Sequence, residues 1–218
     1  MQDFLERNRF FSSLEPGDLV LDAACGTGSE TAYFASQYPS LKFIGVDLES
    51  KFIVEANGRY RDTNNLRFET ADLYNLNISG FGNVKAVLLS QTLSWLKWWE
   101  EELSSLVGPQ VQQIALSTLA WDGPIESEVV HHLGGRGKPG AQRVNYNVDA
   151  IPILSEFMNN QGFHVQSNEK FIIDIDLFAP SHGGLGSHTI RSETNQRMIF
   201  SGWQHLPWHF FSFTRDAY

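Results

Sequence analysis

The chain has 218 residues and a mass of 24.6 kDa, so we expect a single domain. Hydrophobic residues make up 42% of it, which is enough for a sizeable core and excludes disorder for most of the chain. The chain has 16 Lys and Arg against 25 Asp and Glu, which gives a net charge of −9. A surface that binds the phosphates of a nucleic acid is positively charged, so a nucleic acid is disfavoured as the main partner.

The first half of the chain alternates short apolar runs with amphipathic stretches. Strands are expected at residues 19–21, 43–46, 66–69, 84–89 and 113–119, and helices at residues 3–14, 29–38, 50–60 and 94–107. Strands that alternate with helices indicate βαβ units and a parallel α/β sheet that is buried on both faces. In such sheets ligands bind beyond the carboxyl ends of the strands, so the residues at these ends are the candidates for function.

The second half departs from this alternation. Residues 120–147 are rich in Gly, Pro and His and are too long for an ordinary connection of ~2–6 residues. After them we expect a helix over residues 149–161 with Asp149 as its N-cap and Gly162 at its end, a long strand or pair of strands over residues 163–178, a hairpin over residues 187–202, and a final strand over residues 207–214.

A glycine-bearing turn follows the first strand. Gly26 and Gly28 allow the backbone to turn tightly and to approach a ligand closely. A dinucleotide fingerprint would need a third glycine where the chain has Thr31, and a P-loop would need Gly-Lys-Ser/Thr after the turn. The turn is therefore not built for a pyrophosphate.

Three acids, Asp22, Asp47 and Asp72, end three successive strands. A carboxylate at Asp47 can accept both hydroxyls of a ribose, and one at Asp72 can accept a hydrogen bond from an adenine amino group. Each of these two acids alone is equally consistent with a helix or loop cap. Together, behind a Gly-x-Gly turn, the three acids make a much more specific pattern.

With this pattern the chain resembles the class I S-adenosylmethionine-dependent methyltransferases. Residues 21–28 match the family's first motif, Asp47 matches its ribose-binding acid, and Asp72 matches its adenine-contacting acid. Residues 89–96 look like the Leu-x-Trp stretch of small-molecule members, which include the trans-aconitate and malonyl-carrier-protein carboxyl methyltransferases. The resemblance covers roughly residues 19–119 well, and the remainder only by topology.

The resemblance implies a seven-stranded Rossmann-like sheet, mostly parallel with an antiparallel last strand, and helices on both faces. It also implies S-adenosylmethionine as cofactor and S-adenosylhomocysteine as product. Ala24 is a departure, because the family most often has glycine there; alanine still permits close approach, with weaker packing against the methionine part of the cofactor. The implied cofactor-binding residues are Asp22, Ala24, Gly26, Thr27, Gly28, Asp47, Leu48, Ala71, Asp72, Leu73, Ser90 and Gln91.

The substrate side is expected to come from two insertions in a single domain of residues 1–218, at about residues 120–147 and 180–202. In this fold the loop between the sixth and seventh strands lies over the cofactor's methyl group. His182 and His188 in that loop are candidate general bases for a hydroxyl acceptor. The candidate substrate contacts are Trp95, Arg143, Tyr146 and Arg191, in which an arginine fork would hold a carboxylate or phosphate.

Several alternatives stay open at this point. A small-molecule or carrier-tethered acceptor with O-methylation is favoured, with N- and C-methylation and the identity of the acceptor undecided. The Asn/Asp-Pro-Pro-aromatic motif of adenine-N6 and glutamine methyltransferases is absent from residues 90–93. From other classes, the alternatives are a catalytically silent S-adenosylmethionine-binding protein and a nicotinamide-dependent oxidoreductase, against which Thr31 argues.

The single cysteine, Cys25, excludes an intramolecular disulfide and a cysteine-built zinc site, and we expect no metal site. Asp3 and Glu6 stand where a signal peptide would be basic and then apolar, and no apolar run approaches the ~20 residues that span a bilayer. We therefore expect a cytoplasmic protein without membrane association. The sequence leaves the oligomeric state open.

Overall fold

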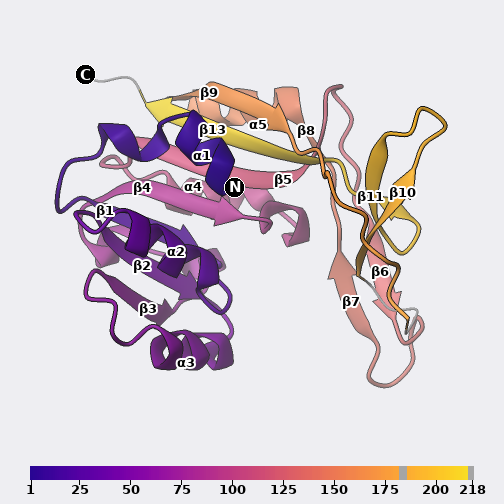
Figure 1. Ribbon diagram of the computed structural model, residues 1–218, viewed down its shortest axis with the longest axis horizontal. Coiled ribbons are helices and arrows are strands. Elements are labelled where there is room, and N and C mark those ends of the chain that lie inside the picture. Colours follow the sequence, from indigo (N-terminus) through magenta and orange to yellow (C-terminus); the bar gives the residue numbers. More distant parts are fainter. Residues whose placement is uncertain (182–185, 216–218) are drawn as a thin grey trace.

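The structure is a computed structural model, and it describes residues 1–181 and 186–215. Five strands form a parallel sheet in the order β3-β2-β1-β4-β5 (Figure 1). The inner strands β1, β4 and β5 are almost entirely buried, as expected for strands that are covered on both faces, whereas the edge strand β3 buries only Phe68. The bounds are β1 Leu19–Ala23, β2 Lys42–Asp47, β3 Leu66–Thr70, β4 Val84–Ser90 and β5 Gln113–Trp121.

Two later strands complete the sheet beyond β5. Strand β13 (Trp208–Arg215) lies between β5 and β9 (Phe163–Lys170) and is antiparallel to both. The short strand β8 (Asp149–Ala150) adds to the carboxyl end of β5. The order β3-β2-β1-β4-β5-β13-β9, with one reversed strand, confirms the expected Rossmann-like methyltransferase sheet of seven strands, with β8 as a short addition.

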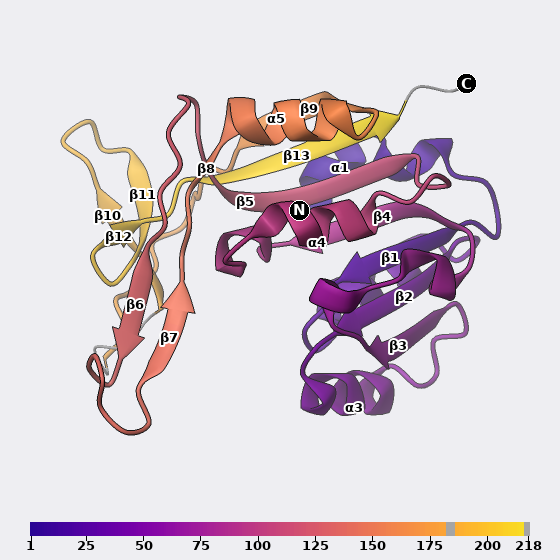
Figure 2. The same ribbon diagram turned by 180° about the vertical axis from the view of Figure 1, so that it is seen from behind.

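Helices cover both faces of the sheet (Figures 1 and 2). Helices α1 and α2 pack on one face in a cluster that includes Phe4, Phe34 and Phe43, and α3 packs against Phe68 of β3. Helices α4 and α5 cover the opposite face. The helices are α1 Gln2–Arg7, α2 Ser29–Gln37, α3 Ser50–Arg59, α4 Trp99–Leu106 and α5 Ile151–Asn160, with 3₁₀ helices η1 Phe10–Ser13, η2 Leu73–Asn75, η3 Ile78–Phe81 and η4 Leu93–Trp95. Within the described part of the chain, no helix is long and apolar enough to cross a membrane.

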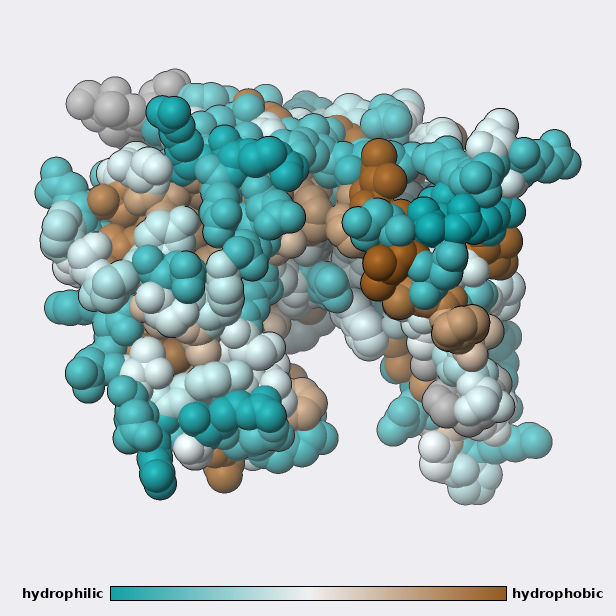
Figure 3. Space-filling view, viewed as in Figure 1, coloured by the Kyte–Doolittle hydropathy of each residue, from teal (hydrophilic) through white to brown (hydrophobic). Residues whose placement is uncertain are grey.

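A separate group of strands lies beyond the carboxyl ends of the parallel strands. It consists of the hairpin β6 (Val130–Leu133) and β7 (Gln142–Asn145) and the antiparallel strands β10 (Ser187–Arg191), β11 (Arg197–Ser201) and β12 (Gln204–His205). We call these five strands the β-lobe. The lobe stands apart from the sheet, and the space-filling view shows the molecule hollowed between the two (Figures 1 and 3).

Three predicted elements differ in extent from the structure. The helix expected over residues 3–14 is divided into α1 and η1, because Arg9 between them adopts a left-handed φ of 51°. The helix expected over residues 94–107 begins only at Trp99, after η4. The strand expected over residues 163–178 ends at Lys170, where the chain leaves the sheet for the β-lobe.

The expected N-cap role of Asp149 is also wrong, although Gly162 follows α5 with a φ of 80°, as expected. Ala150 is the N-cap, and Asp149 lies one residue earlier in β8. Its buried carboxylate accepts a hydrogen bond of 2.6 Å from the Thr118 hydroxyl, which lies 2.7 Å from the Ser94 hydroxyl. Burial raises the pKa of Asp149 to about 7. This network fastens β8 and η4 to the end of β5.

The raised pKa of Asp149 predicts a pH-dependent stability. Because the folded protein holds this proton up to about pH 7 and the unfolded chain releases it near its ordinary value of 3.8, the stability falls as the pH rises from about 4 to 7. In Asp149→Asn, whose amide oxygen still accepts from Thr118, this part of the slope disappears. Measured by urea unfolding, the free energy of unfolding of the variant relative to that of wild type should rise by roughly 2–4 kcal/mol as the pH goes from 4 to 7.

The control for this measurement is Asp62→Asn, because the Asp62 side chain is 93% exposed. It should keep the wild-type slope. Burial also raises the pKa of Asp22, to about 8, so a residual loss of stability up to that pH remains in both variants. Parallel slopes for wild type and Asp149→Asn would contradict the assignment.

Candidate functional site

A chamber of about 480 Å³ lies between the carboxyl ends of the parallel strands and the β-lobe. A cavity of this size is typical of a small-molecule site. The turn after β1 and the ends of β4 and β5 form its sheet side, with Asp22, Ala24, Cys25, Gly26, Ser29, Glu30, Ser90, Gln91 and Ser117. The other lining residues are Met1, Phe171, Ile173, Leu177, Ser187, Ile199, Trp208 and Phe210.

Asp22 lies at the end of β1, 2% exposed, on the chamber wall. Burial and the nearby charge of Glu30 raise its pKa to about 8, against a hydrogen bond donated by Thr31. Thr31 therefore has a structural role in this turn, where a dinucleotide fingerprint would have its third glycine. A buried carboxyl of raised pKa beside a cavity favours a cationic ligand group, which would stabilise its ionised form.

Asp47 joins the end of β2 to the turn after β1. One carboxylate oxygen accepts the Gly26 N–H at 2.8 Å, and the other accepts the Glu49 N–H at 2.9 Å. Each oxygen keeps a free lone pair on a half-buried side chain, so the carboxylate is able to accept further hydrogen bonds from a diol. Asp47 thus fixes the turn, and its remaining lone pairs can accept the ribose hydrogen bonds that the resemblance implies.

The turn itself runs through a series of left-handed residues. Gly26 has a φ of 56° and Gly28 a φ of 75°, and a Cβ atom on Gly28 would collide with the Phe68 ring. Ala24 also has a positive φ, of 60°. The departure at Ala24 therefore affects the backbone: glycine adopts this conformation freely, whereas alanine is strained in it.

The residues after β2 and β3 lie at the same edge of the sheet but outside the chamber lining. Leu48 is 62% exposed, and Leu73 is buried in the main core. Asp72 caps η2, accepting the Tyr74 N–H at 3.0 Å and the Asn75 side-chain amide at 2.9 Å. Ala71 donates its N–H to the Asp47 carbonyl at 3.0 Å.

The ends of β4 and β5 bring three polar residues to the chamber. Gln91, with a φ of 53°, donates its N–H to the Ser117 hydroxyl at 2.9 Å. The Ser90 hydroxyl is buried and has no hydrogen-bond partner within the described residues. Sequence reasoning missed Ser117, because it lies in the middle of a buried strand and comes beside Ser90 only through the β4–β5 pairing.

Two of the predicted substrate residues meet in space. The rings of Trp95 and Tyr146 are 4.9 Å apart, and His131 and Trp203 extend the series with centroid distances of 5.4 Å and 5.8 Å. Tyr146 is buried in a cluster that reaches the chamber through Ile199, while Trp95 is 47% exposed. Neither Trp95 nor Tyr146 belongs to the chamber lining, so the two rings form an aromatic pair outside it.

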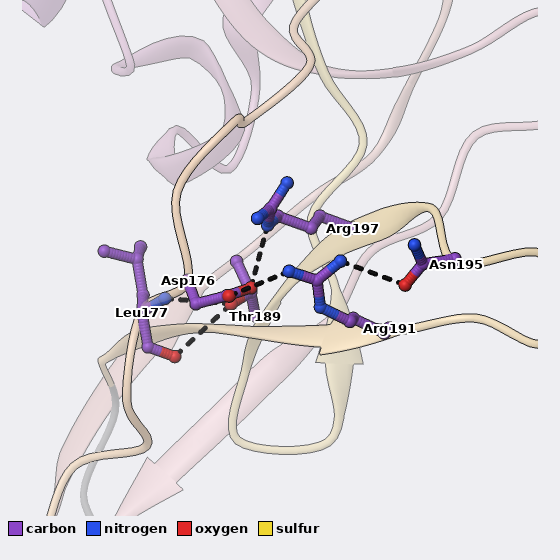
Figure 4. Close-up of polar contacts among 6 residues, drawn as sticks. All are labelled: Asp176, Leu177, Thr189, Arg191, Asn195 and Arg197. Carbon is purple, nitrogen blue, oxygen red and sulfur yellow. Dashed lines mark hydrogen bonds and ion pairs between the residues drawn. The ribbon is translucent and has the colours of Figure 1, made fainter.

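The two predicted substrate arginines lie in ion pairs on the β-lobe. Arg191 and Arg197 both donate to Asp176, each at 2.8 Å (Figure 4). Hydrogen bonds from Arg197 and Arg191 lower the pKa of Asp176 to about 2. Arg143 in β7 pairs with Glu128 at 3.5 Å. Neither Arg143 nor Arg191 belongs to the chamber lining.

The candidate bases are only partly placed. His182 lies outside the described residues. His188 lies in β10 beside Phe200, with ring centroids 6.1 Å apart, and its Nδ1 is buried without a partner in the described part of the chain. Because side chains alternate along a strand, His188 points to the face of β10 opposite the chamber-lining Ser187.

The strain at Ala24 gives a stability prediction. Ala24→Gly should stabilise the protein by about 0.5–1 kcal/mol, since the relief of the left-handed strain exceeds the entropy that glycine adds to the unfolded chain. Ala23→Gly is the matched control: Ala23 lies in β1 and is buried, so this variant should lose about 1 kcal/mol. Denaturant unfolding of both variants checks the sign, and a destabilised Ala24→Gly would contradict the strain.

Comparison with known proteins extends the geometric evidence. The profile of the family described as "Methyltransferase domain" matches residues 20–108. A trans-aconitate 2-methyltransferase of Deinococcus radiodurans is 31% identical over 77 residues, 35% of this chain, and an mRNA cap guanine-N(7) methyltransferase of Saccharomyces cerevisiae is 38% identical over 55 residues, 25% of this chain. The matches span only 28% and 12% of the lengths of these two relatives.

Solved structures establish the fold over the whole chain. A structure from Listeria monocytogenes, described as an S-adenosylmethionine dependent methyltransferase, has a TM-score of 0.67 at 15% identity and covers 99% of this chain and 96% of its own. Magnesium protoporphyrin IX methyltransferase from Synechocystis PCC 6803, with bound S-adenosylhomocysteine, has a TM-score of 0.59 at 15% identity, with 99% and 83% covered. In its sheet order, and over residues 20–108 in its match to the methyltransferase domain, the chain is similar to the class I S-adenosylmethionine-dependent methyltransferases.

Proposed function

We propose that the chain binds S-adenosylmethionine and transfers its methyl group to a small-molecule or carrier-tethered acceptor, releasing S-adenosylhomocysteine. The observation that carries this proposal is the chamber itself. Its lining includes Asp22 and Gly26 at the turn after β1, Ile173 in the segment after β9, and Ile199 in the β-lobe. Donor and acceptor thus have adjoining places in one cavity.

The acids at the strand ends suit the charge of the donor. S-adenosylmethionine carries a sulfonium and an ammonium, and Asp22 and Glu30 line the chamber on the side of the turn. We assign the ribose hydroxyls to Asp47 and the adenine to the edge formed by Leu48, Asp72 and Leu73. The remaining contacts of the donor fall to the backbone at Ala24 to Gly28, to Ala71, and to Ser90 and Gln91.

In methyl transfer the protein itself forms no covalent bond to the substrate. The acceptor atom attacks the methyl carbon in line with the breaking bond to sulfur, and the electron pair of that bond stays on the sulfur. The chain contributes positioning and the exclusion of water. We favour an oxygen acceptor; an acceptor hydroxyl must lose a proton, for which we propose His182 or His188.

A small-molecule acceptor fits the charge of the chain better than a nucleic acid. The yeast relative acts on an mRNA cap by its name, and the bacterial relative on trans-aconitate. A net charge of −9 opposes binding to a phosphate backbone. We propose that Trp95 and Tyr146 contact the acceptor, and that Arg143 and Arg191 reach only the outer part of a long or tethered one.

The first test is calorimetry of the intact chain with S-adenosylmethionine, S-adenosylhomocysteine and NAD. We expect one molecule of either methyl-donor form to bind per chain, and no binding of NAD. Binding of S-adenosylmethionine without turnover on any acceptor would favour a silent binding protein. Absence of binding would overturn the proposal.

The role of Asp47 gives a quantitative expectation. Asp47→Ala should weaken S-adenosylhomocysteine binding by about 1–3 kcal/mol, about 5- to 150-fold, because buried ribose hydroxyls lose their acceptor. Asp62→Ala, on an exposed side chain, should bind as wild type does. Since Asp47 also fixes the turn, the melting temperature of each variant without cofactor is measured in parallel, and unchanged affinity of Asp47→Ala would remove the ribose assignment.

The two candidate bases are tested by substitution. With a hydroxyl acceptor, loss of the base should lower kcat by about 10²–10⁴-fold. His182→Ala and His188→Ala are compared, with His164→Ala near the beginning of β9 as a control outside this loop. If all three variants keep the wild-type kcat, neither histidine is the base.

A further inference from the structure

The chamber has two chemically different halves. Its only described carboxylates, Asp22 and Glu30, lie on the side of the turn after β1. The half that faces the β-lobe is lined by Phe171, Ile173, Leu177, Ile199, Trp208 and Phe210. Within the described residues, no Lys, Arg or His side chain lines either half. The space that remains for an acceptor is therefore apolar on its outer side and acidic on its inner side.

The apolar half is built on a backbone that is held at both ends. After β9, Phe171 donates its N–H to the Trp208 carbonyl at 2.8 Å. Further on, Leu177 donates its N–H to the Thr189 hydroxyl at 2.9 Å, and Thr189 returns its N–H to the Leu177 carbonyl at 3.0 Å. These bonds anchor residues 171–177 at both ends, so Ile173 and Leu177 lie on a backbone that is hydrogen-bonded to neighbouring strands.

The cations nearest to this wall are already paired. Arg191 and Arg197 both bind Asp176, the residue before Leu177, and the close-up shows the two guanidinium groups turned to the same carboxylate (Figure 4). An anionic acceptor in the chamber would lose its hydration, find no Lys, Arg or His side chain among the described lining residues, and face the charge of Glu30. The ammonium of Met1, which also lines the chamber, interacts with Glu30, and burial lowers its pKa.

Two hydroxyls lie where the halves meet. The Ser90 hydroxyl is buried without a partner in the described part of the chain, and the Ser117 hydroxyl accepts the Gln91 N–H, which leaves its own proton free to be donated. Ser90 ends β4, Ser117 is its partner in the middle of β5, and both residues line the chamber. They offer hydrogen bonds to one polar atom of a molecule that is otherwise enclosed by hydrocarbon.

We infer that the acceptor half takes an uncharged, largely apolar molecule that presents a hydroxyl group, such as a phenol, and rejects carboxylates. This inference rests on the proposed function. In the reaction, the hydroxyl oxygen forms a bond to the methyl carbon as the carbon–sulfur bond breaks. The hydroxyl proton passes to the histidine base proposed above, His182 or His188, and the electron pair of the broken bond leaves with S-adenosylhomocysteine.

The test uses 2-naphthol and 2-naphthoate, which share one ring system and differ in charge at pH 7. Calorimetry measures their binding to the protein saturated with S-adenosylhomocysteine. We expect 2-naphthol to bind at least about tenfold more tightly than 2-naphthoate, because the carboxylate would be buried without a partner. Equal or tighter binding of 2-naphthoate, or no binding of 2-naphthol, overturns the inference.

Two matched variants locate the site. Ile173→Asp places a carboxylate on the chamber wall and should weaken 2-naphthol binding at least about tenfold. Ile175→Asp makes the same change two residues away, where the side chain is 57% exposed and outside the lining, and should bind as wild type does. An equal loss in both variants, or in neither, contradicts the assignment.

A third variant is expected to gain affinity for 2-naphthoate, a result that a misfolded protein would not give. Leu177→Arg supplies the missing cation and should reverse the preference, with 2-naphthoate binding more tightly than 2-naphthol. Retention of the wild-type preference contradicts the inference. Binding of S-adenosylhomocysteine is measured for every protein: its absence in wild type defeats the proposed function, whereas its presence with no preference for 2-naphthol defeats only the inference about the acceptor.

Discussion

The hydrogen bond from the Gly26 N–H to the Asp47 carboxylate is the contact on which the donor side of the site depends. It joins the turn after β1 to the end of β2, two strands that run side by side in the sheet. Parallel strands must end at one edge, so a short acidic side chain at the end of one strand reaches the turn of its neighbour. The same carboxylate thereby shapes the turn and presents its remaining lone pairs to a ligand.

Packing, as well as hydrogen bonding, stabilises the turn after β1. Gly28 and Gly45 leave no room for a side chain because the Phe68 ring fills the space beside them. The left-handed conformation of Ala24 persists against its own preference because these surroundings fix the backbone on both sides. A strained residue next to a cavity is the pattern expected where local stability is given up for the shape of a site.

Much of this arrangement could be predicted from the sequence, because the signals are local. Apolar runs ending in an acid predicted β1, β2 and β3, and the Gly-x-Gly turn with Asp47 and Asp72 carried the resemblance to the methyltransferase family. The rest depends on pairing between distant segments. The residues around Arg191 in the sequence do not predict its ion pair with Asp176. Likewise, the residues around Asp149 do not predict its hydrogen bond with Thr118. Residues 171–178 read as a strand because they are apolar, but their apolar side chains serve the chamber and the surface instead.

Hydrogen bonds attach the end of the insertion after β5 to the segment that follows β4. The insertion after β5 returns to the sheet through Asn147, which donates its N–H to the Ser94 carbonyl and its side-chain amide to the Leu96 carbonyl, both at 2.8 Å. These bonds flank Trp95 and hold it against Tyr146. The Ser94 hydroxyl also accepts the Leu119 N–H at 2.8 Å, two residues beyond the chamber-lining Ser117 in β5. The Trp95–Tyr146 ring pair and the chamber are thus attached to the same strand, and the proposed acceptor contacts depend on the insertion while the turn after β1 does not.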